Sequence, residues 1–233
     1  ADIANLLLNK LFGETRQLKG LPSKTSKVTT FSTSSYAPSS LNAIICRTNA
    51  TAFEYFFKFH SYLNGEKKIR LEVDGKRSKD IFSGIFQLRA NKRPTCKELQ
   101  NFSSYQELVD HIQVFGEVEG ATTELKTFLD LTNQYSWQVI EWALENSMAD
   151  DETDPKNTLV ISTSHKSKGL EWDNVLIAKG FNYKILDKKL MISADEKRLL
   201  YVTVTRAKNI LFTDGINDLL EHLNSKNMEI SNA

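Results

Sequence analysis

A run of polar and charged residues, Ser162 to Asp173 (STSHKSKGLEWD), carries the side chains of this chain that are best suited to chemistry. The run directly follows Thr158 to Thr163 (TLVIST), whose apolar and β-branched residues are typical of a buried strand. Ligands of open α/β sheets bind at the carboxyl ends of strands. The loop is therefore placed where a binding or catalytic site is expected.

Four residues of this loop suit a nucleotide or nucleic-acid ligand. Lys168 supplies a charge compatible with phosphate, and His165 supplies a hydrogen-bond donor or acceptor. Glu171 supplies a carboxylate able to bind a sugar hydroxyl, and Gly169 permits a positive φ or close backbone approach. The alternative interpretation is a polar loop that enters a helix, in which Lys166 and Lys168 are merely solvated.

A second stretch, Glu196 to Lys208 (EKRLLYVTVTRAK), has apolar residues at helical spacing and an arginine near its end. Leu199 and Val202 lie in the same sector of the expected helix as Arg206. An arginine fixed at the end of an anchored helix suits stabilisation of a developing phosphate charge, which is worth about 10³–10⁵ in rate. The alternative is a surface arginine that the helix dipole favours near a C-terminus.

A third polar group, Arg47, Thr48 and Asn49, ends the apolar run Asn42 to Arg47 (NAIICR). Side chains at the end of such a buried strand can contact a nucleic-acid backbone or a base. An alternative of equal weight makes Thr48 or Asn49 the N-cap of a helix and pairs Arg47 with an acid.

Strand and helix patterns alternate on both sides of a helical block. This arrangement predicts an α/β fold with a parallel sheet flanked by helices and an inserted helical domain. Strands are predicted at 27–32, 42–47, 158–163, 174–178 and 209–213. Helices are predicted at 2–18, 50–63, 78–90, 104–115, 121–134, 137–145, 195–208 and 216–223. No long strand is expected from Asn64 to Lys156.

Charge is distributed unevenly within the helical block, although the formal net charge of the chain is only +1. Lys58 to Lys97 holds eleven Lys or Arg against four acids, whereas Glu107 to Asp154 holds one lysine against twelve acids. The contrast indicates two differently used faces. The alternative is two solvated surfaces without a partner.

Composition is that of an ordinary globular protein, with 40% hydrophobic and 25% charged residues. No stretch of about 18 apolar residues occurs, so no association with a membrane is expected. The two cysteines, Cys46 and Cys96, lack CxxC spacing, so they predict no metal site and suggest free thiols inside the cell. Because the chain starts with Ala1 and not with Met, a fragment boundary is expected there.

In order and spacing, the stretches RTNA, TSHKSKGLEWD and EKRLLYVTVTRAK resemble the C-terminal motifs of UvrD/Rep-type superfamily 1 DNA helicases. The second family motif has the form T-x-H-x-x-KGLE plus an aromatic residue, and the third ends in TRA. The residues of the motifs, GLEWD and LLYVTVTRAK, are most similar to those of the F-box DNA helicase branch and its bacterial relatives. The chain departs from the pattern at Thr203, where many relatives carry glycine, and at Trp172, where phenylalanine is common. The resemblance covers most of Lys27 to Gly215, apart from the inserted block.

The resemblance implies the fold of a second RecA-like motor domain, similar to P-loop NTPases. The implied domains are a leading helix and connector (1–23), the motor domain (24–63 and 157–225), a mostly helical accessory subdomain (64–156) and a tail (226–233). The inserted block is short for the accessory subdomain of larger relatives. Its basic stretch, Arg70 to Arg93, is a candidate for contact with duplex DNA.

The resemblance also implies residue roles. Arg206 would be the catalytic arginine that reaches the ATP γ-phosphate, and Glu171 would bind the ribose. The implied ATP-binding set comprises Lys168, Gly169, Glu171 and Arg206. The implied set facing single-stranded DNA comprises Arg47, Asn49, Thr163 and His165.

The sequence contains no P-loop, G-x-x-x-x-G-K-[ST], whose backbone would hold the phosphates. Gly20 to Thr25 lacks the GK pair, and Gly75-Lys76 is followed by Arg77. An apolar strand ending in Asp-Glu for magnesium is also absent. We therefore expect ATP and Mg²⁺ to bind together with a missing N-terminal RecA-like domain of the same protein, and this chain alone to be inactive. The alternative is a stand-alone RecA-like module that binds DNA or protein without ATP turnover.

Overall fold

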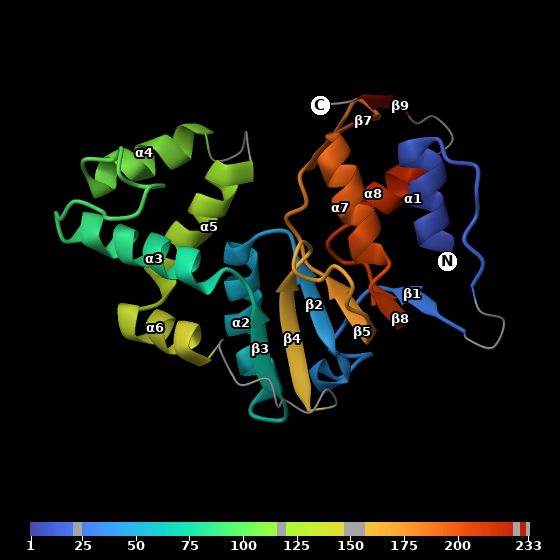
Figure 1. Ribbon diagram of the computed structural model, residues 1–233, viewed down its shortest axis with the longest axis horizontal. Helices are drawn as coiled ribbons and strands as arrows, with labels where there is room; N and C mark the ends of the chain where they lie inside the picture. The colour runs from blue at the N-terminus through green and yellow to red at the C-terminus, as the bar shows by residue number, and fades with distance from the viewer. Residues whose placement is uncertain (21–24, 116–119, 147–156, 226–228, 232–233) are drawn as a thin grey trace. The chain divides into compact units, whose positions relative to one another are not determined.

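A computed structural model describes residues 1–20, 25–115, 120–146, 157–225 and 229–231. The chain forms two compact units, one made of Ala1–Arg47 with Leu159–Ala233 and the other of Thr48–Thr158 (Figure 1). In sequence, the second unit is therefore an insertion into the first. In the part of the chain that the structure describes, no helix has the length and apolar character needed to cross a bilayer.

The first unit is built on a parallel sheet. Its strands are β1 (Lys27–Thr29), β2 (Ala43–Cys46), β4 (Thr158–Thr163), β5 (Trp172–Ile177) and β8 (Ala207–Phe212). They lie in the order β1-β8-β5-β2-β4, and each neighbouring pair is parallel. All four residues of β2 are buried, as expected for a central strand covered on both faces. The predicted α/β, RecA-like fold is confirmed.

Three helices and a small second sheet complete this unit. The helices are α1 (Asp2–Phe12), α7 (Ala194–Val204) and α8 (Asn217–Asn224), and a 3₁₀ turn covers Pro38–Ser40. The second sheet contains β6 (Tyr183–Leu186), β7 (Lys189–Ile192) and β9 (Glu229–Ser231). The hairpin β6–β7 was not predicted, although Asp187 and Lys188 take the positive φ values of 49° and 64° that a two-residue hairpin turn requires.

Helix α1 is shorter than the predicted 2–18 because Gly13 ends it with a φ of 66°. The N–H groups of Gly13 and Glu14 donate to the carbonyls of Asn9 and Leu8, which satisfies the last turn of the helix. Helix α7 likewise ends at Val204, so Arg206 lies in the turn before β8 and not on the predicted helix 195–208.

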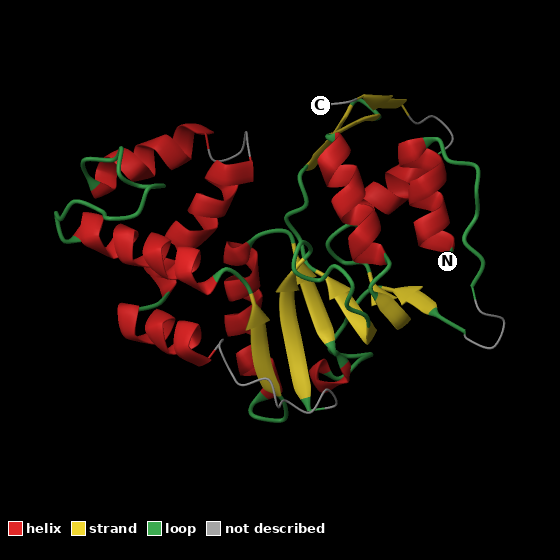
Figure 2. Cartoon of the chain, viewed as in Figure 1, coloured by secondary structure: helices red, strands yellow, loops and turns green. Residues whose placement is uncertain are grey.

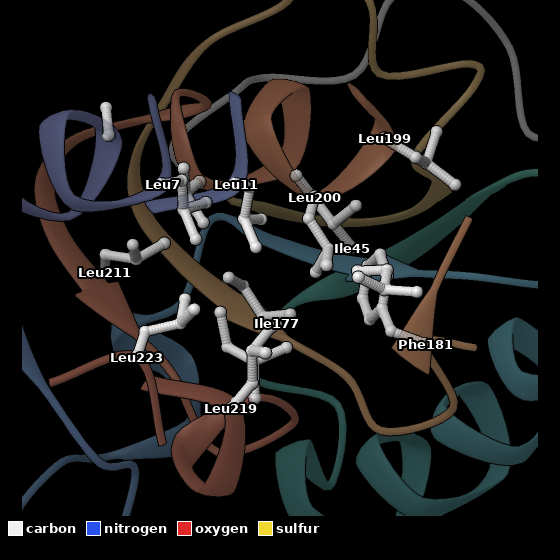
Figure 3. Close-up of a cluster of buried hydrophobic side chains, with 14 of the residues drawn as sticks. Leu7, Leu11, Ile45, Ile177, Phe181, Leu199, Leu200, Leu211, Leu219 and Leu223 are labelled. Carbon is white, nitrogen blue, oxygen red and sulfur yellow. The ribbon is translucent and has the colours of Figure 1, made fainter. Parts of the chain in front are cut away.

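The core of the first unit packs α1, α7 and α8 against the sheet (Figure 3). Leu7 of α1, Leu200 of α7 and Leu219 of α8 are fully buried in this cluster, together with Ile45 and Ile177 of the sheet. Helix α1, which the sequence analysis assigned to a separate leading segment, therefore contributes to the core of this unit.

The second unit is mostly helical (Figure 2). It contains α2 (Asn49–Leu63), β3 (Lys68–Glu72), α3 (Gly75–Arg89), α4 (Tyr105–Phe115), α5 (Gly120–Gln134) and α6 (Trp137–Asn146). Its core includes a chain of edge-to-face aromatic rings, in which the Phe82 centroid lies 5.3 Å from Phe53 and 4.7 Å from Phe128. This unit starts at Thr48, so it includes helix α2, whereas the sequence analysis placed the boundary after residue 63. Strand β3 was not predicted.

Replacing Leu7 by alanine should lower the free energy of unfolding by about 2–5 kcal/mol, because it leaves a cavity between α1 and the rest of the core. Urea denaturation of the whole chain measures this change. Leu186→Ala is the matched control, since that leucine is 58% exposed and its loss should change stability by less than about 0.5 kcal/mol. Equal effects of the two substitutions would contradict the placement of α1 in the core.

Candidate functional site

Two fully buried serines, Ser164 and Ser167, hold the loop between β4 and β5 in place through hydrogen bonds. The backbone N–H of Ser164 donates to the carbonyl of Cys46 at the end of β2 (2.8 Å), and its hydroxyl donates to the same carbonyl (3.2 Å). The hydroxyl of Ser167 donates to the carbonyl of Ser164 (2.9 Å). The serines therefore fix the loop on the sheet, while His165, Lys166 and Lys168 are exposed.

The loop runs from the carboxyl ends of the parallel strands to their amino ends. It starts at the carboxyl end of β4, where Thr163 is in register with Cys46 of β2. It ends at the amino end of β5, where Trp172 is in register with Ala207, the first residue of β8. The prediction that the site lies at the carboxyl ends of the strands thus describes only the first half of the loop. Glu171 lies at the other end.

Arg206 forms hydrogen bonds with the loop residues on both sides of Glu171. Its Nη1 donates to the carbonyl of Leu170 (2.9 Å), and its own carbonyl accepts from the N–H of Trp172 (3.0 Å). Its Nε donates to the carbonyl of Val202 in the last turn of α7 (2.8 Å). The two residues expected to contact ATP from different motifs, Glu171 and Arg206, therefore lie in one place.

A second bond joins α7 to the same loop. The hydroxyl oxygen of Thr203 lies 2.9 Å from the hydroxyl oxygen of Ser164 and 2.8 Å from the carbonyl oxygen of Leu199, so its single proton is shared between these two acceptors. Both hydroxyl-bearing residues are fully buried. Glycine at position 203, which the family resemblance led us to expect, could not make this bond, so the departure from the expected pattern has a structural consequence.

Glu196, in the first turn of α7, is a buried carboxylate that the sequence analysis did not single out as a site residue. Its oxygens accept from Nε of Arg47 (2.8 and 3.1 Å) and from the N–H of Asn182 (2.9 Å). The spacing Ser193-x-x-Glu196 is a signal for a helix start, and Ser193 does accept from the N–H of Glu196 (3.2 Å). That signal could locate the helix, but it could not show that the carboxylate binds Arg47.

His165 lies in a positive environment. Partial burial lowers the pKa of His165 below its ordinary value of 6.5, and the charges of Arg47 and Lys168 lower it further, while Glu196 acts in the opposite direction. The imidazole is therefore mainly neutral at pH 7. A neutral ring offers one donor and one acceptor, which suits contact with a base or a sugar.

The residues predicted to face DNA differ in accessibility. Arg47 and His165 are at least partly exposed and interact electrostatically, so the structure brings them together. Thr163 is only 6% exposed, which does not support direct contact with a polymer. Asn49 belongs to the second unit, where its side-chain oxygen accepts from the N–H of Asp74 (3.1 Å).

The backbone of Asn49 is held by a charged cluster within the second unit. Its N–H donates to Glu124 of α5 (3.1 Å), and Arg77 of α3 donates to the other oxygen of the same carboxylate (3.0 Å). Arg77 also pairs with Glu98 (3.0 Å). Since these partners are distant from Asn49 in sequence and no periodicity links them, sequence reasoning did not identify them.

The loop and the turn that contains Arg206 together carry cationic side chains that can bind an anion and a carboxylate that can accept hydrogen bonds from hydroxyl groups. Lys168 and Glu171 are exposed, and Gly169 has a φ of 81° with no atom within 4 Å of the position of a Cβ. Arg206 adds a half-buried guanidinium beside them. Among the described residues, no group of three or more His, Cys, Asp or Glu side chains is arranged to hold a metal ion. The site thus combines two cations, Lys168 and Arg206, with one carboxylate, Glu171.

Comparison with known proteins identifies a family that matches most of the chain. A family model described as the UvrD-like helicase C-terminal domain matches residues 31–216, which include all three polar stretches. The chain is 28% identical over 239 residues to a protein named F-box DNA helicase protein 1 from Schizosaccharomyces pombe. The match covers 96% of this chain and 26% of that relative, so the chain spans about a quarter of the relative's length.

Replacing Glu196 by glutamine should lower the free energy of unfolding by about 1–3 kcal/mol, because Arg47 and the N–H of Asn182 lose a charged, buried acceptor. Thermal or urea unfolding of the whole chain measures the change. Asp195→Asn is the matched control, since its carboxylate pairs with Arg198 on the surface and such pairs contribute little. A Glu196→Gln protein as stable as the control would show that the buried pair does not stabilise the fold.

Proposed function

The chain belongs to the UvrD-like helicase C-terminal domain family, and we propose that it is the second motor domain of an ATP-dependent DNA helicase or translocase. The proposal rests on one observation: Arg206 forms hydrogen bonds with Leu170 and Trp172, the residues on either side of Glu171. A guanidinium and a carboxylate from two distant stretches are thereby held together, as binding of one nucleotide requires.

In this proposal Arg206 is the catalytic residue, and its guanidinium approaches the γ-phosphate of ATP. Its present acceptors are neutral oxygens, and a phosphate oxygen forms a stronger, charge-assisted bond. Glu171 accepts from the ribose, and Lys168 and the open backbone at Gly169 line the same side of the loop. When bound, ATP supplies the free energy for movement along DNA.

The other end of the loop provides the contact with single-stranded DNA. His165 contributes a neutral imidazole, and Arg47, oriented by Glu196, contributes a cation beside it. Thr163 supports the loop from its buried position, and Asn49 is proposed as a separate DNA contact within the second unit. One short loop, held rigid by its buried serines, contacts both ligands in this proposal. A movement of the loop at the nucleotide therefore also moves the residues that contact the DNA strand. ATP binding then closes two RecA-like domains, and hydrolysis opens them.

ATP and Mg²⁺ are held, in this proposal, together with an N-terminal RecA-like domain that carries the P-loop. The sequence of this chain has none, so the chain alone binds DNA without hydrolysing ATP. The relative from Schizosaccharomyces pombe is named as a DNA helicase, which supports DNA as the substrate.

Replacing Arg206 by alanine in the full-length protein should lower DNA-stimulated ATP hydrolysis by about 10³-fold or more, because the developing phosphate charge loses its cation. Nucleotide binding should be largely retained. Steady-state ATPase assays and nucleotide-binding titrations measure the two effects. Arg206→Lys keeps a charge but loses the guanidinium geometry, and Arg198→Ala is the control, because that arginine is exposed and pairs only locally with Asp195. Normal turnover of Arg206→Ala would remove Arg206 from the site.

Replacing both His165 and Asn49 by alanine should weaken binding of single-stranded DNA by about tenfold or more, since each change removes a hydrogen-bonding side chain. Fluorescence anisotropy with a labelled oligonucleotide measures the affinity. The double variant Asn101→Ala/Gln113→Ala, which removes exposed polar side chains elsewhere, is the control. Thermal unfolding shows whether loss of the Asn49–Asp74 bond perturbs the fold. Unchanged affinity would refute the DNA contact.

A further inference from the structure

The second unit contains a cavity of about 320 Å³ that the proposed function does not use. Its aromatic lining consists of Phe56 and His60 of α2 and Trp142 of α6. Lys68, the first residue of β3, and Lys67, which precedes it, line the same cavity. The two lysines give this lining a positive charge, which favours an anionic or neutral ligand.

The aromatic side of the cavity is arranged as a stacking surface. The rings of His60 and Trp142 meet edge to face with centroids 4.9 Å apart, and the centroid of Phe56 lies 5.7 Å from that of Trp142. Phe56 is buried, whereas Trp142 is 38% exposed. An exposed indole supported by other rings keeps its orientation, so it can stack on a planar ligand at little entropic cost.

The cationic side is fixed by a tight turn after α2. Asn64 and Gly65 take positive φ values of 42° and 85°, and the N–H of Glu66 donates to the carbonyl of Leu63 (2.8 Å). The N–H of Lys68 donates to the carbonyl of Asn157 (3.0 Å). The backbone therefore presents the two lysines in a defined position at the cavity. Lys67 is half-buried, and this partial burial lowers the pKa of its ammonium group.

We propose that this cavity binds one nucleotide unit of single-stranded DNA, with the base against Trp142 and His60 and the phosphate at Lys67 and Lys68. Aromatic stacking combined with cations along the backbone is how proteins hold single strands without sequence preference. The volume lies at the lower end of the range of about 300–1,000 Å³ for small-ligand sites, so it suits a single base. A base paired within a duplex could not enter.

This inference deepens the proposed function by adding a strand contact, and it rests on that function only for the identity of the polymer as DNA. The contact involves none of Arg47, His165, Glu171 or Arg206. Failure of the cavity assignment would therefore leave the ATPase result for Arg206 intact. Conversely, loss of the Arg206 result would leave a strand-binding cavity in the second unit.

The test is fluorescence anisotropy of a labelled oligothymidylate with the full chain. Trp142→Ala should weaken binding by about 5- to 150-fold, the loss expected for one base–aromatic stack. Trp142→Tyr should restore most of the affinity, because it keeps a stacking ring. Val139→Ala is the matched control, since this residue lies on the same helix, is also 38% exposed and does not line the cavity.

The charge contribution is tested with two pairs of substitutions that remove equal charge from the same unit. Lys67→Gln/Lys68→Gln should weaken binding and reduce the slope of log affinity against log salt by about 0.7 for each phosphate that the lysines no longer neutralise. Lys79→Gln/Lys97→Gln, which changes exposed lysines outside the cavity, should change affinity by less than the first pair.

Cross-linking identifies the source of the nucleotide. An oligonucleotide with 5-iodouracil should attach on irradiation to Trp142 or His60, and thymidine 5′-monophosphate should compete only weakly. Absence of oligonucleotide binding by the unmodified chain, an unchanged affinity of Trp142→Ala, or equal effects of the two lysine pairs would overturn the proposal. A monophosphate that binds as tightly as the oligonucleotide would overturn the assignment to a strand.

Discussion

The hydrogen bonds of Arg206 determine how the candidate site of the first unit is assembled. A guanidinium is always charged and carries five N–H donors, so a half-buried one must find acceptors. Here they are the carbonyls of Leu170 and Val202, the hydroxyl of Thr205 and, at a longer distance of 3.5 Å, the carbonyl of Ser167. Because one acceptor lies on the loop and another on α7, the loop cannot move independently of the helix. The buried Thr203–Ser164 bond makes the same connection a second time.

The parallel sheet places two pairs of candidate site residues at opposite ends of one loop. Arg47 and His165 lie where β2 and β4 end, whereas Glu171 and Arg206 lie just before β5 and β8 begin. The buried serines make the intervening loop a rigid connection and not a flexible tether. In the proposed function, one end of this loop binds the nucleotide and the other end binds the strand, an arrangement that suits a motor coupling two separate ligands.

The sequence predicted the parallel sheet because β2, β4 and β5 are apolar runs whose burial leaves little choice of structure. The limits of α1 and α7 were wrong by several residues, since a glycine in the left-handed region and a turn ended them earlier than periodicity indicated. Proximity of Glu171 and Arg206 followed from a family resemblance and not from spacing. The partners of Arg47 and Asn49, which are Glu196 and Glu124, depend on tertiary packing that no local pattern encodes.

The most direct measurement is an experimental structure of the full-length protein with Mg²⁺ and a non-hydrolysable ATP analogue. The account predicts that the carboxylate of Glu171 contacts the ribose and that the guanidinium of Arg206 has exchanged backbone carbonyls for the terminal phosphate. A nucleotide bound elsewhere, with Arg206 still on the carbonyls of Leu170 and Val202, would contradict it.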